Sequence, residues 1–424
     1  MLTRLRAAAI SPLLRRTLAS STVKTAPNST IRIVGACGRL SVGSNMETDV
    51  AELTATLGGV ECPWADVVQL ETTEEGDALN LALDVGVAEG TNPRSLALAV
   101  TVPSAFNVAV EMAPEVACDV DIKGWLEGTV HVAAQGSVTV GTVRGMLCSV
   151  ESGRGDVSVK TIDGNLTVKA ACGGVKLGKI MGEEVKVDAA GAVSSKALYG
   201  KEVEIRAGGG LSAAVLSAEA GFLELGGAST LDQLEGEVDV RLAAGGELVA
   251  QGSGGLRQLR VVRHEAFERD GGDAGGAGPG GGGDGGAITI NLPPTARARA
   301  TLLGGSVSID EALQPRDVPP AAASAMDIEG VRTVALGADE AGGRRRRRDG
   351  GQAVASATAT WADGGGGGGG GGGEGKGEGE GAWPCELLVL APECSVNVAA
   401  QDWFAQRIKG LGDIDKSGTM FDRK

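Results

Sequence analysis

Glycine recurs every nine residues through the middle of the chain, and alanine replaces it only once. The recurring positions are Gly155, Gly164, Gly173, Gly182, Gly191, Gly200, Gly209, Ala218, Gly227, Gly236, Gly245 and Gly254. Between them polar and apolar residues alternate, as in GDVSVKTID at 155–163, so each unit predicts a turn followed by a short strand. Units this short cannot each bury an apolar face. They must stack, which predicts a parallel β-solenoid with a continuous core.

Two nine-residue units make one coil of 18 residues. Residues 18 apart then stack at about 4.8 Å, and two inward-facing ladders keep this interval. The ladders are Val157, Val175, Val193 and Leu211, and Ile162, Ile180, Leu198, Leu216 and Leu234. In the second half of the coil Val185 and Val203 keep the interval, whereas Leu166 and Val238 are displaced by one residue, which predicts a corner of variable length. We expect the glycines at the corners, because φ > 0 has no Cβ penalty there.

Strand-like segments flank the regular coils, which cover residues 136–255. Residues 31–135 alternate without the nine-residue beat, and we expect a β-rich N-terminal cap and the first coils there. Residues 287–340 continue the β coils, and 385–411 form the final strands and a short capping helix, QDWFAQRIKGL at 401–411. Caps are expected because an open terminal coil exposes unpaired N–H and C=O groups. The predicted fold class is therefore all-β, a single-chain parallel β-solenoid with 18-residue coils.

Two low-complexity stretches interrupt this body. Residues 271–286 are almost wholly Gly with Asp, and 342–381 carry RRRRR at 344–348 followed by a ten-glycine run. Neither can bury enough apolar surface to become ordered, so both are expected to be disordered insertions, and 412–424 a flexible tail. The arginine run could grip RNA or an acidic partner. Because aromatic residues are not interleaved with the arginines, we interpret the run as part of a low-complexity insert, and no nucleic-acid partner is expected.

The N-terminal segment has the composition of a targeting sequence. Residues 1–46 contain no Asp or Glu, and basic residues alternate there with apolar and hydroxyl residues. The basic residues of positions 1–26 are Arg4, Arg6, Arg15, Arg16 and Lys24. This pattern predicts an organellar transit peptide over 1–26, mitochondrial or alternatively plastid, while a disordered basic tail stays open. Arg15 and Arg16 interrupt any secretory apolar region, and no later run of 18 apolar residues predicts a membrane span.

Charge and cysteine content restrict the partners. The formal net charge is −15, and about −20 without the five basic residues of the presequence, so polyphosphate partners would be repelled. The cysteines are odd in number and never spaced as CxxC, which argues against a disulfide framework and against a zinc site. They are Cys37, Cys62, Cys118, Cys148, Cys172, Cys385 and Cys394. We expect them to be small core or strand residues in a reducing compartment.

Three segments add a family resemblance. VTVPSAFNVAVEMA at 100–113, the repeats GDVSVKTIDGNLTVKA at 155–170 and GEVDVRL at 236–242, together with the glycine beat, resemble the putative-adhesin domain family of unknown function. That family is widespread in bacteria and has an organelle-targeted eukaryotic branch. The likeness covers residues 31–255 and, with SVNVAAQDWFAQRIKG at 395–410, the whole mature chain. It implies a β-solenoid fold and supplies no catalytic residue. The Gly and Arg insertions depart from the family pattern.

Candidate catalytic groups are few. His131 and His264 are the two histidines, and neither lies in a Ser/His/Asp or Cys/His signature. Glycan lyases and hydrolases with β-helix folds place acids at equal positions of neighbouring coils. Glu184 and Glu202 are such a pair, which could raise one pKa and create a proton donor, or be relieved by Lys186 or Lys201. The other outward positions are mixed in charge and predict a solvated face. They are Lys160, Lys169, Lys176, Lys186, Asp188, Glu204 and Glu237.

No metal or cofactor site is predicted. GDIDKSGTMFDRK at 412–424 begins like a calcium loop, but Lys424 stands where the bidentate Glu is needed. No catalytic, cofactor-binding or metal-binding residue is therefore assigned. The sequence favours a non-enzymatic β-solenoid scaffold or protein-binding module in an organelle, with an unknown protein partner. A carbohydrate-active β-helix enzyme and a cell-surface adhesin are the alternatives.

Overall fold

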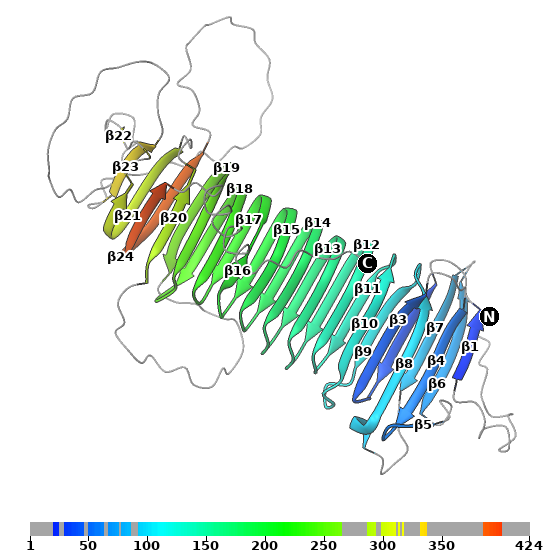
Figure 1. Cartoon of the computed structure of the whole chain (residues 1–424). Helices are drawn as coiled ribbons and strands as arrows, with labels where there is room; N and C mark the ends of the chain where they lie inside the picture. Colours follow the sequence, from blue (N-terminus) through cyan, green and yellow to red (C-terminus); the bar gives the residue numbers. More distant parts are fainter. Residues whose placement is uncertain are drawn as a thin grey trace, which may run out of the picture. The chain divides into compact units, whose positions relative to one another are not determined.

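The computed structural model describes residues 20–24, 29–45, 50–62, 67–75, 78–85, 92–264, 286–293, 298–310, 313, 316–317, 331–336 and 385–400. Within these ranges the chain is mostly β-strand, with a 3-10 turn at Pro93–Ser95 and no α-helix (Figure 1). None of the described residues forms a helix long and apolar enough to cross a membrane. The chain divides into two compact units, Met1–Leu231 and Asp232–Lys424.

The first unit is built from strands β1 to β18. They are β1 (Ser20–Lys24), β2 (Thr30–Gly35), β3 (Arg39–Asn45), β4 (Val50–Leu57), β5 (Val60–Cys62), β6 (Val68–Glu75), β7 (Ala78–Val85), β8 (Leu96–Pro103), β9 (Asn107–Met112), β10 (Asp119–Leu126), β11 (Val130–Ala134), β12 (Val138–Ser152), β13 (Val157–Ala170), β14 (Val175–Ala189), β15 (Val193–Ala207), β16 (Leu211–Ala213), β17 (Leu216–Leu225) and β18 (Ser229–Ala243), which continues beyond Leu231.

The predicted 18-residue stacking is confirmed in β13 to β17. β13 pairs in parallel with β14, β14 with β15, and β15 with both β16 and β17 (Figure 1). Both apolar ladders are in register across these pairs. The stacked residues are Val157, Val175, Val193 and Leu211, and Ile162, Ile180, Leu198 and Leu216, and each is no more than 2% exposed. The core is thus a solenoid-like column of Val, Ile and Leu side chains.

Each long strand has two arms joined by a bend. In β13 the first arm is 157–163 and the second is 166–170. The bend falls at Gly164, whose φ of +144° disfavours any side chain, and a Cβ there would lie 1.7 Å from the carbonyl oxygen of Gly145. The register slips by one residue at this bend, so Leu166 pairs with Val185. The displacement of Leu166 in the sequence is therefore a true feature of the corner.

The glycine beat has a second cause, which the spacing alone does not reveal. Several beat positions lack a positive φ, so conformational freedom does not explain them. Gly173 shows the other reason: a Cβ there would lie 2.2 Å from the carbonyl oxygen of Gly155 in the preceding coil. The turns stack too closely to admit a side chain. Close approach, more often than left-handed geometry, selects glycine along this ladder.

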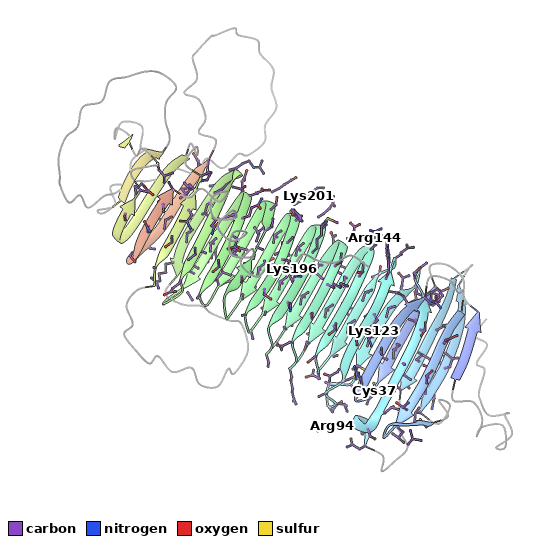
Figure 2. The ribbon with its side chains drawn as sticks, in the orientation of Figure 1. Cys37, Arg94, Lys123, Arg144, Lys196 and Lys201 are labelled. Carbon is purple, nitrogen blue, oxygen red and sulfur yellow. The ribbon has the colours of Figure 1, made fainter. Side chains whose placement is uncertain are left out.

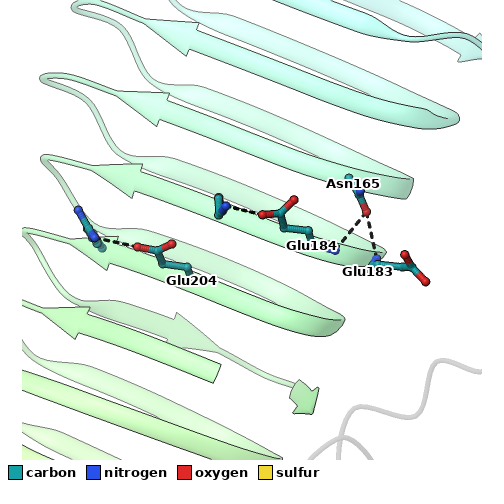
Figure 3. A network of polar contacts seen from close by, with 6 residues as sticks. Asn165, Glu183, Glu184 and Glu204 are labelled. Atoms are coloured by element: carbon teal, nitrogen blue, oxygen red, sulfur yellow. Dashed lines mark hydrogen bonds and ion pairs between the residues drawn. The ribbon is translucent and has the colours of Figure 1, made fainter. Parts of the chain in front are cut away.

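Polar side chains join successive turns. At the bend the Asn165 side-chain oxygen accepts hydrogen bonds from the backbone N–H groups of Glu183 and Glu184, at 3.2 and 3.1 Å (Figure 3). At the opposite turns Asp119 accepts from the N–H of Ser137 at 2.9 Å. Asp156 accepts from Gly174 N–H at 2.8 Å in the same way. These bonds satisfy N–H groups at places where the strand ladder is interrupted.

The N-terminal coils do not stack in sequence order. β2 lies between β7 and β9, and β3 lies between β8 and β10, all in parallel. One coil, β2–β3, is therefore inserted between two coils that follow it in the chain. β10 and β11 pair with β12 at an 18-residue offset, as in Val120 with Val138 and Val130 with Cys148. The 18-residue coil thus begins before the glycine beat does.

Antiparallel strands occupy the end of this stack, where the sequence predicted a cap. β4 pairs antiparallel with β1, β5 and β8, and β6 pairs antiparallel with β7. These pairings cover the hydrogen-bonding edges of the parallel strands β7 and β8. β1 lies inside the segment 1–26 that was assigned to a transit peptide.

The second unit has one strand inserted out of order. It contains residues 232–243 of β18. Its other strands are β19 (Leu248–His264), β20 (Ile288–Leu292), β21 (Ala298–Ile309), β22 (Arg316–Asp317), β23 (Val331–Leu336) and β24 (Glu386–Ala400). β24 pairs in parallel with β19 and β20 on one side and with β21 on the other (Figure 1). β23 pairs antiparallel with β21 and with β22. The segment predicted as the final strands therefore lies within the ladder.

Several expectations fall outside the described residues. They are the capping helix at 401–411, the tail at 412–424, the Gly-rich stretch 271–286 apart from Gly286, and the Arg- and Gly-rich stretch 342–381.

Candidate functional site

The two histidines lie on different strands, β11 and β19. His131 is exposed on β11 in the first unit, and His264 ends β19 in the second, where its side chain is not described. Among the described residues no three His, Cys, Asp or Glu side chains gather closely enough to hold a metal ion. A hollow of about 200 Å³ beside Asp239 and Arg260 is smaller than the roughly 300–1,000 Å³ usual for small-molecule sites.

The carboxylate pair singled out in the sequence is in register. Glu184 and Glu202 are direct partners across β14 and β15. Glu184 forms an ion pair with Lys186, and this hydrogen bond and charge raise the pKa of Lys186 above its usual value (Figure 3). Lys201 pairs instead with Glu183. Of the two expected lysines, Lys186 therefore lessens the repulsion between Glu184 and Glu202, whereas Lys201 pairs outside this carboxylate pair.

Replacing Glu184 or Glu202 with glutamine should leave the fold intact and remove no glycan-cleaving activity. The side chains are exposed, and an ion pair on the surface adds little stability. The check is the melting temperature together with reducing-end release from a panel of neutral and acidic glycans. A parent chain that cleaves a glycan, with loss of cleavage in either variant, would establish the enzyme alternative.

The second arms carry charges that neutralise one another. Outward residues of alternating sign stack in register along β12 to β17: Glu151, Lys169, Asp188, Arg206 and Glu224. Lys169 lies 3.5 Å from Glu151, and Arg206 lies 3.6 Å from Glu224. Every charge in this column has a neighbour of opposite sign one coil away. Such cross-strand pairs leave little net charge for a partner to recognise.

The first arms carry a cluster of unpaired lysines. Lys160, Lys176, Lys179 and Lys196 are exposed on β13, β14 and β15, and we call this surface the lysine face. None of the four side chains forms an ion pair or hydrogen bond with a residue that the structure describes. Asp163 on the same arms contacts Arg144 at 4.0 Å, which compensates its charge. The lysine face therefore has an uncompensated positive charge on an acidic chain.

The register places the four lysines within three successive coils. Lys176 stacks between two serines of the neighbouring coils, and Lys179 stacks between Thr161 and Ala197. Lys160 and Lys196 hold equal positions two coils apart, which corresponds to about 10 Å. Figure 2 shows Lys196 on the broad side of the coils and Lys201 at the bend. The register therefore gathers the four lysine positions on one surface of β13, β14 and β15.

Small hydroxyl side chains surround the lysines. Thr139, Ser158, Ser194, Ser212 and Thr230 continue the column of Lys176 along the first arms. Short side chains leave the lysine stems free to reach outward. The surface is thus hydrophilic, and Tyr199, 39% exposed, is its one exposed aromatic ring on the described first arms.

The sequence pattern predicts only part of the lysine face. Lys160 and Lys176 are predicted to be outward residues on a surface of mixed charge, because spacing alone does not show which arm carries a residue. The structure places them on the first arm, while Lys169, Lys186, Asp188 and Glu204 lie on the second. Lys179 and Lys196 were missed. Two consecutive outward residues separate buried positions in each first arm, as Lys160 and Thr161 separate Val159 and Ile162, and this breaks the simple alternation.

Comparison with known proteins shows no match to a protein-family model and none to a curated protein. Two solved bacterial structures have structural similarity to the chain. One is a putative adhesin from Bacteroides fragilis NCTC 9343, with 14% identity, 57% of this chain and 94% of that chain covered, and a TM-score of 0.27. The other is a putative cell adhesion protein from Clostridium sporogenes ATCC 15579, with 7% identity, 90% and 99% covered, and a TM-score of 0.17. Neither supports membership of an organelle-targeted eukaryotic branch.

Proposed function

We propose that the chain is a non-catalytic binding module whose lysine face docks an acidic segment of a partner protein. The observation that carries this proposal is the contrast between the two arms. Charges on the second arms are paired along the coils, whereas Lys160, Lys176, Lys179 and Lys196 have no neutralising neighbour among the described residues. Adjacent like charges repel, and an opposite charge from a partner would relieve them.

The size of the lysine face favours a short acidic segment over a long polyanion. The four lysines span three coils, while the chain as a whole has a net charge of −15. A nucleic acid or acidic polysaccharide would extend past the patch and meet this negative charge. Single-stranded nucleic acid also gains affinity from aromatic stacking, for which the first arms offer little. A few clustered Asp or Glu side chains match the patch without that repulsion.

The test removes four positive charges from either arm. One variant carries Lys→Gln at Lys160, Lys176, Lys179 and Lys196. Its matched control carries Lys→Gln at Lys169, Lys186 and Lys201 and Arg206→Gln, so that both lose the same charge. The probe is a fluorescent peptide of alternating Glu and Gly, followed by anisotropy at 50 and 300 mM salt. We expect at least a tenfold weaker affinity and a smaller salt dependence for the lysine-face variant, and less than a threefold change for the control.

Equal losses of affinity in both variants would show that binding depends on net charge alone, and this would contradict the proposal. Single-stranded RNA or heparin could instead bind more tightly than the peptide, with the same dependence on the lysine face. That result would contradict a protein partner and show that the lysine face binds a polyanion. Proximity labelling with the full chain in cells, compared between the two variants, then identifies the partner. A carbohydrate-active enzyme and a surface adhesin remain the alternative functions.

We further propose that the N-terminal segment directs the chain to mitochondria, with the plastid as the alternative. The basic, acid-free composition of residues 1–46 supports this. Because β1 begins at Ser20, deletion of residues 1–19 removes most of the basic residues and keeps the β1–β4 pairing. In a plant or algal cell, the full chain fused to a fluorescent protein should enter mitochondria, and the shortened chain should not. Secretion of the full chain would contradict the proposal.

A further inference from the structure

Two cysteines far apart in the sequence meet inside the first unit. Cys37 lies in the turn between β2 and β3, and Cys118 directly precedes β10. β3 and β10 pair in parallel, with Arg39 opposite Asp119, so the two turns stack on each other. Their sulfur atoms lie 3.4 Å apart, and both residues are fully buried. The odd cysteine count and the absence of CxxC gave no sign of this pair.

The environment couples the two thiols. The hydrogen bond with Cys118 lowers the pKa of Cys37, while burial opposes this effect. The same hydrogen bond, together with burial, raises the pKa of Cys118. Cys37 is therefore the thiol that ionises first, because the hydrogen bond with Cys118 stabilises its thiolate. A third sulfur atom lies beside this pair: Met112 Sδ accepts a hydrogen bond from the Cys37 thiol at 3.9 Å.

We propose that Cys37 and Cys118 are a disulfide-forming site, closed when the chain meets a small-molecule disulfide as oxidant. The Cys37 thiolate attacks the oxidant and forms a mixed disulfide, and one small thiolate leaves and takes up a proton. The Cys118 thiolate then attacks Cys37 Sγ and expels the second small thiolate. Two electrons and two protons pass from the protein to the oxidant, which becomes two thiols. The sulfurs need only move from 3.4 Å to about 2.05 Å.

The bond would fix the inserted coil in place. β2–β3 lies between coils that come later in the chain, and the link joins its turn to the turn before β10. The cysteines are 81 residues apart, so the closed loop is long and the unfolded chain loses much of its freedom. Because both thiols are buried, they react with the oxidant when the turns open or before the coil has formed. Whether the disulfide is present therefore depends on the redox conditions during folding.

The experiment refolds the full chain from denaturant in glutathione buffers of graded redox poise. Cys62→Ser and Cys172→Ser remove the two less buried thiols among the cysteines whose burial the structure describes. Tryptic mapping without reductant should show residues 33–39 joined to residues 95–123, the peptides that contain Cys37 and Cys118. Cys148 is the internal control: burial raises its pKa to about 12, and it should remain a thiol. The oxidised chain should melt several degrees above the reduced chain.

Two single variants, Cys37→Ser and Cys118→Ser, complete the design. In either variant the melting temperature should no longer depend on the redox poise, while circular dichroism shows that the strands still form. A refolded parent chain without the 33–39 to 95–123 link, even in the most oxidising buffer, would overturn the proposal. So would links to Cys148 or Cys385 of equal abundance, since they would show random pairing. This test is independent of the lysine face.

Discussion

Replacing Leu198 with aspartate is expected to lower the free energy of unfolding of the first unit by about 5 kcal/mol. Leu198 is fully buried and stacks between Ile180 and Leu216 in the second apolar ladder. The substitution removes apolar surface from the core and places a carboxylate where no polar partner is available. Urea unfolding followed by circular dichroism measures the change.

Ser194→Asp is the matched control for this substitution. It introduces the same carboxylate into the same arm of β15, but at an exposed position. Its effect should stay within about 0.5 kcal/mol. If Leu198→Asp unfolds at the same urea concentration as the parent, the ladder is not the core of the coil.

Deleting residues 385–400 should abolish the cooperative folding of the second unit. β24 supplies parallel partners to β19, β20 and β21, and its inward residues Leu387, Val389 and Val398 are buried. Without β24 these strands lose the hydrogen bonds of the edges that face it and the apolar contacts with its buried side chains. Hydrogen exchange should then be fast in β20 and β21, while β13 to β15 in the first unit keep their protection.

A deletion of residues 364–381 provides the control for the loss of β24. It shortens the connection between β23 and β24 and keeps every described strand. Because the entropy of loop closure depends on the logarithm of loop length, the stability should change by less than about 1 kcal/mol. Val389→Asp adds a test within the full chain, with an expected loss of about 4 kcal/mol in the second unit. Unchanged protection of β20 and β21 after removal of β24 would contradict its place in the ladder.

The sequence predicted best what depends on the repeat itself. The 18-residue interval of Val157, Val175 and Val193 reports stacking directly, because each residue meets its counterpart in the next coil. The displaced Leu166 predicted the slipped bend for the same reason. The stacked pair Glu184 and Glu202 also followed from spacing alone.

The rest depended on contacts that spacing does not encode. β2–β3 and β24 are inserted between strands that are distant in the chain. Several parallel strands have similar local patterns, so the sequence does not show which of them will be the partners. The lysine face required knowing which arm carries Lys160 and which carries Lys169. Cys37 and Cys118 meet only because two turns 81 residues apart stack.

The insertion of β24 also has a consequence for synthesis on the ribosome. β21 ends at Ile309 and β24 begins at Glu386, so at roughly 5–20 residues per second β21 emerges several seconds before its parallel partner. During that delay the edges of β19 and β20 that β24 will occupy are free, and β21 can pair with them directly. β24 must then displace this early pairing to take its place. Slower elongation between the two strands would lengthen the delay and lower the yield of correctly threaded chains.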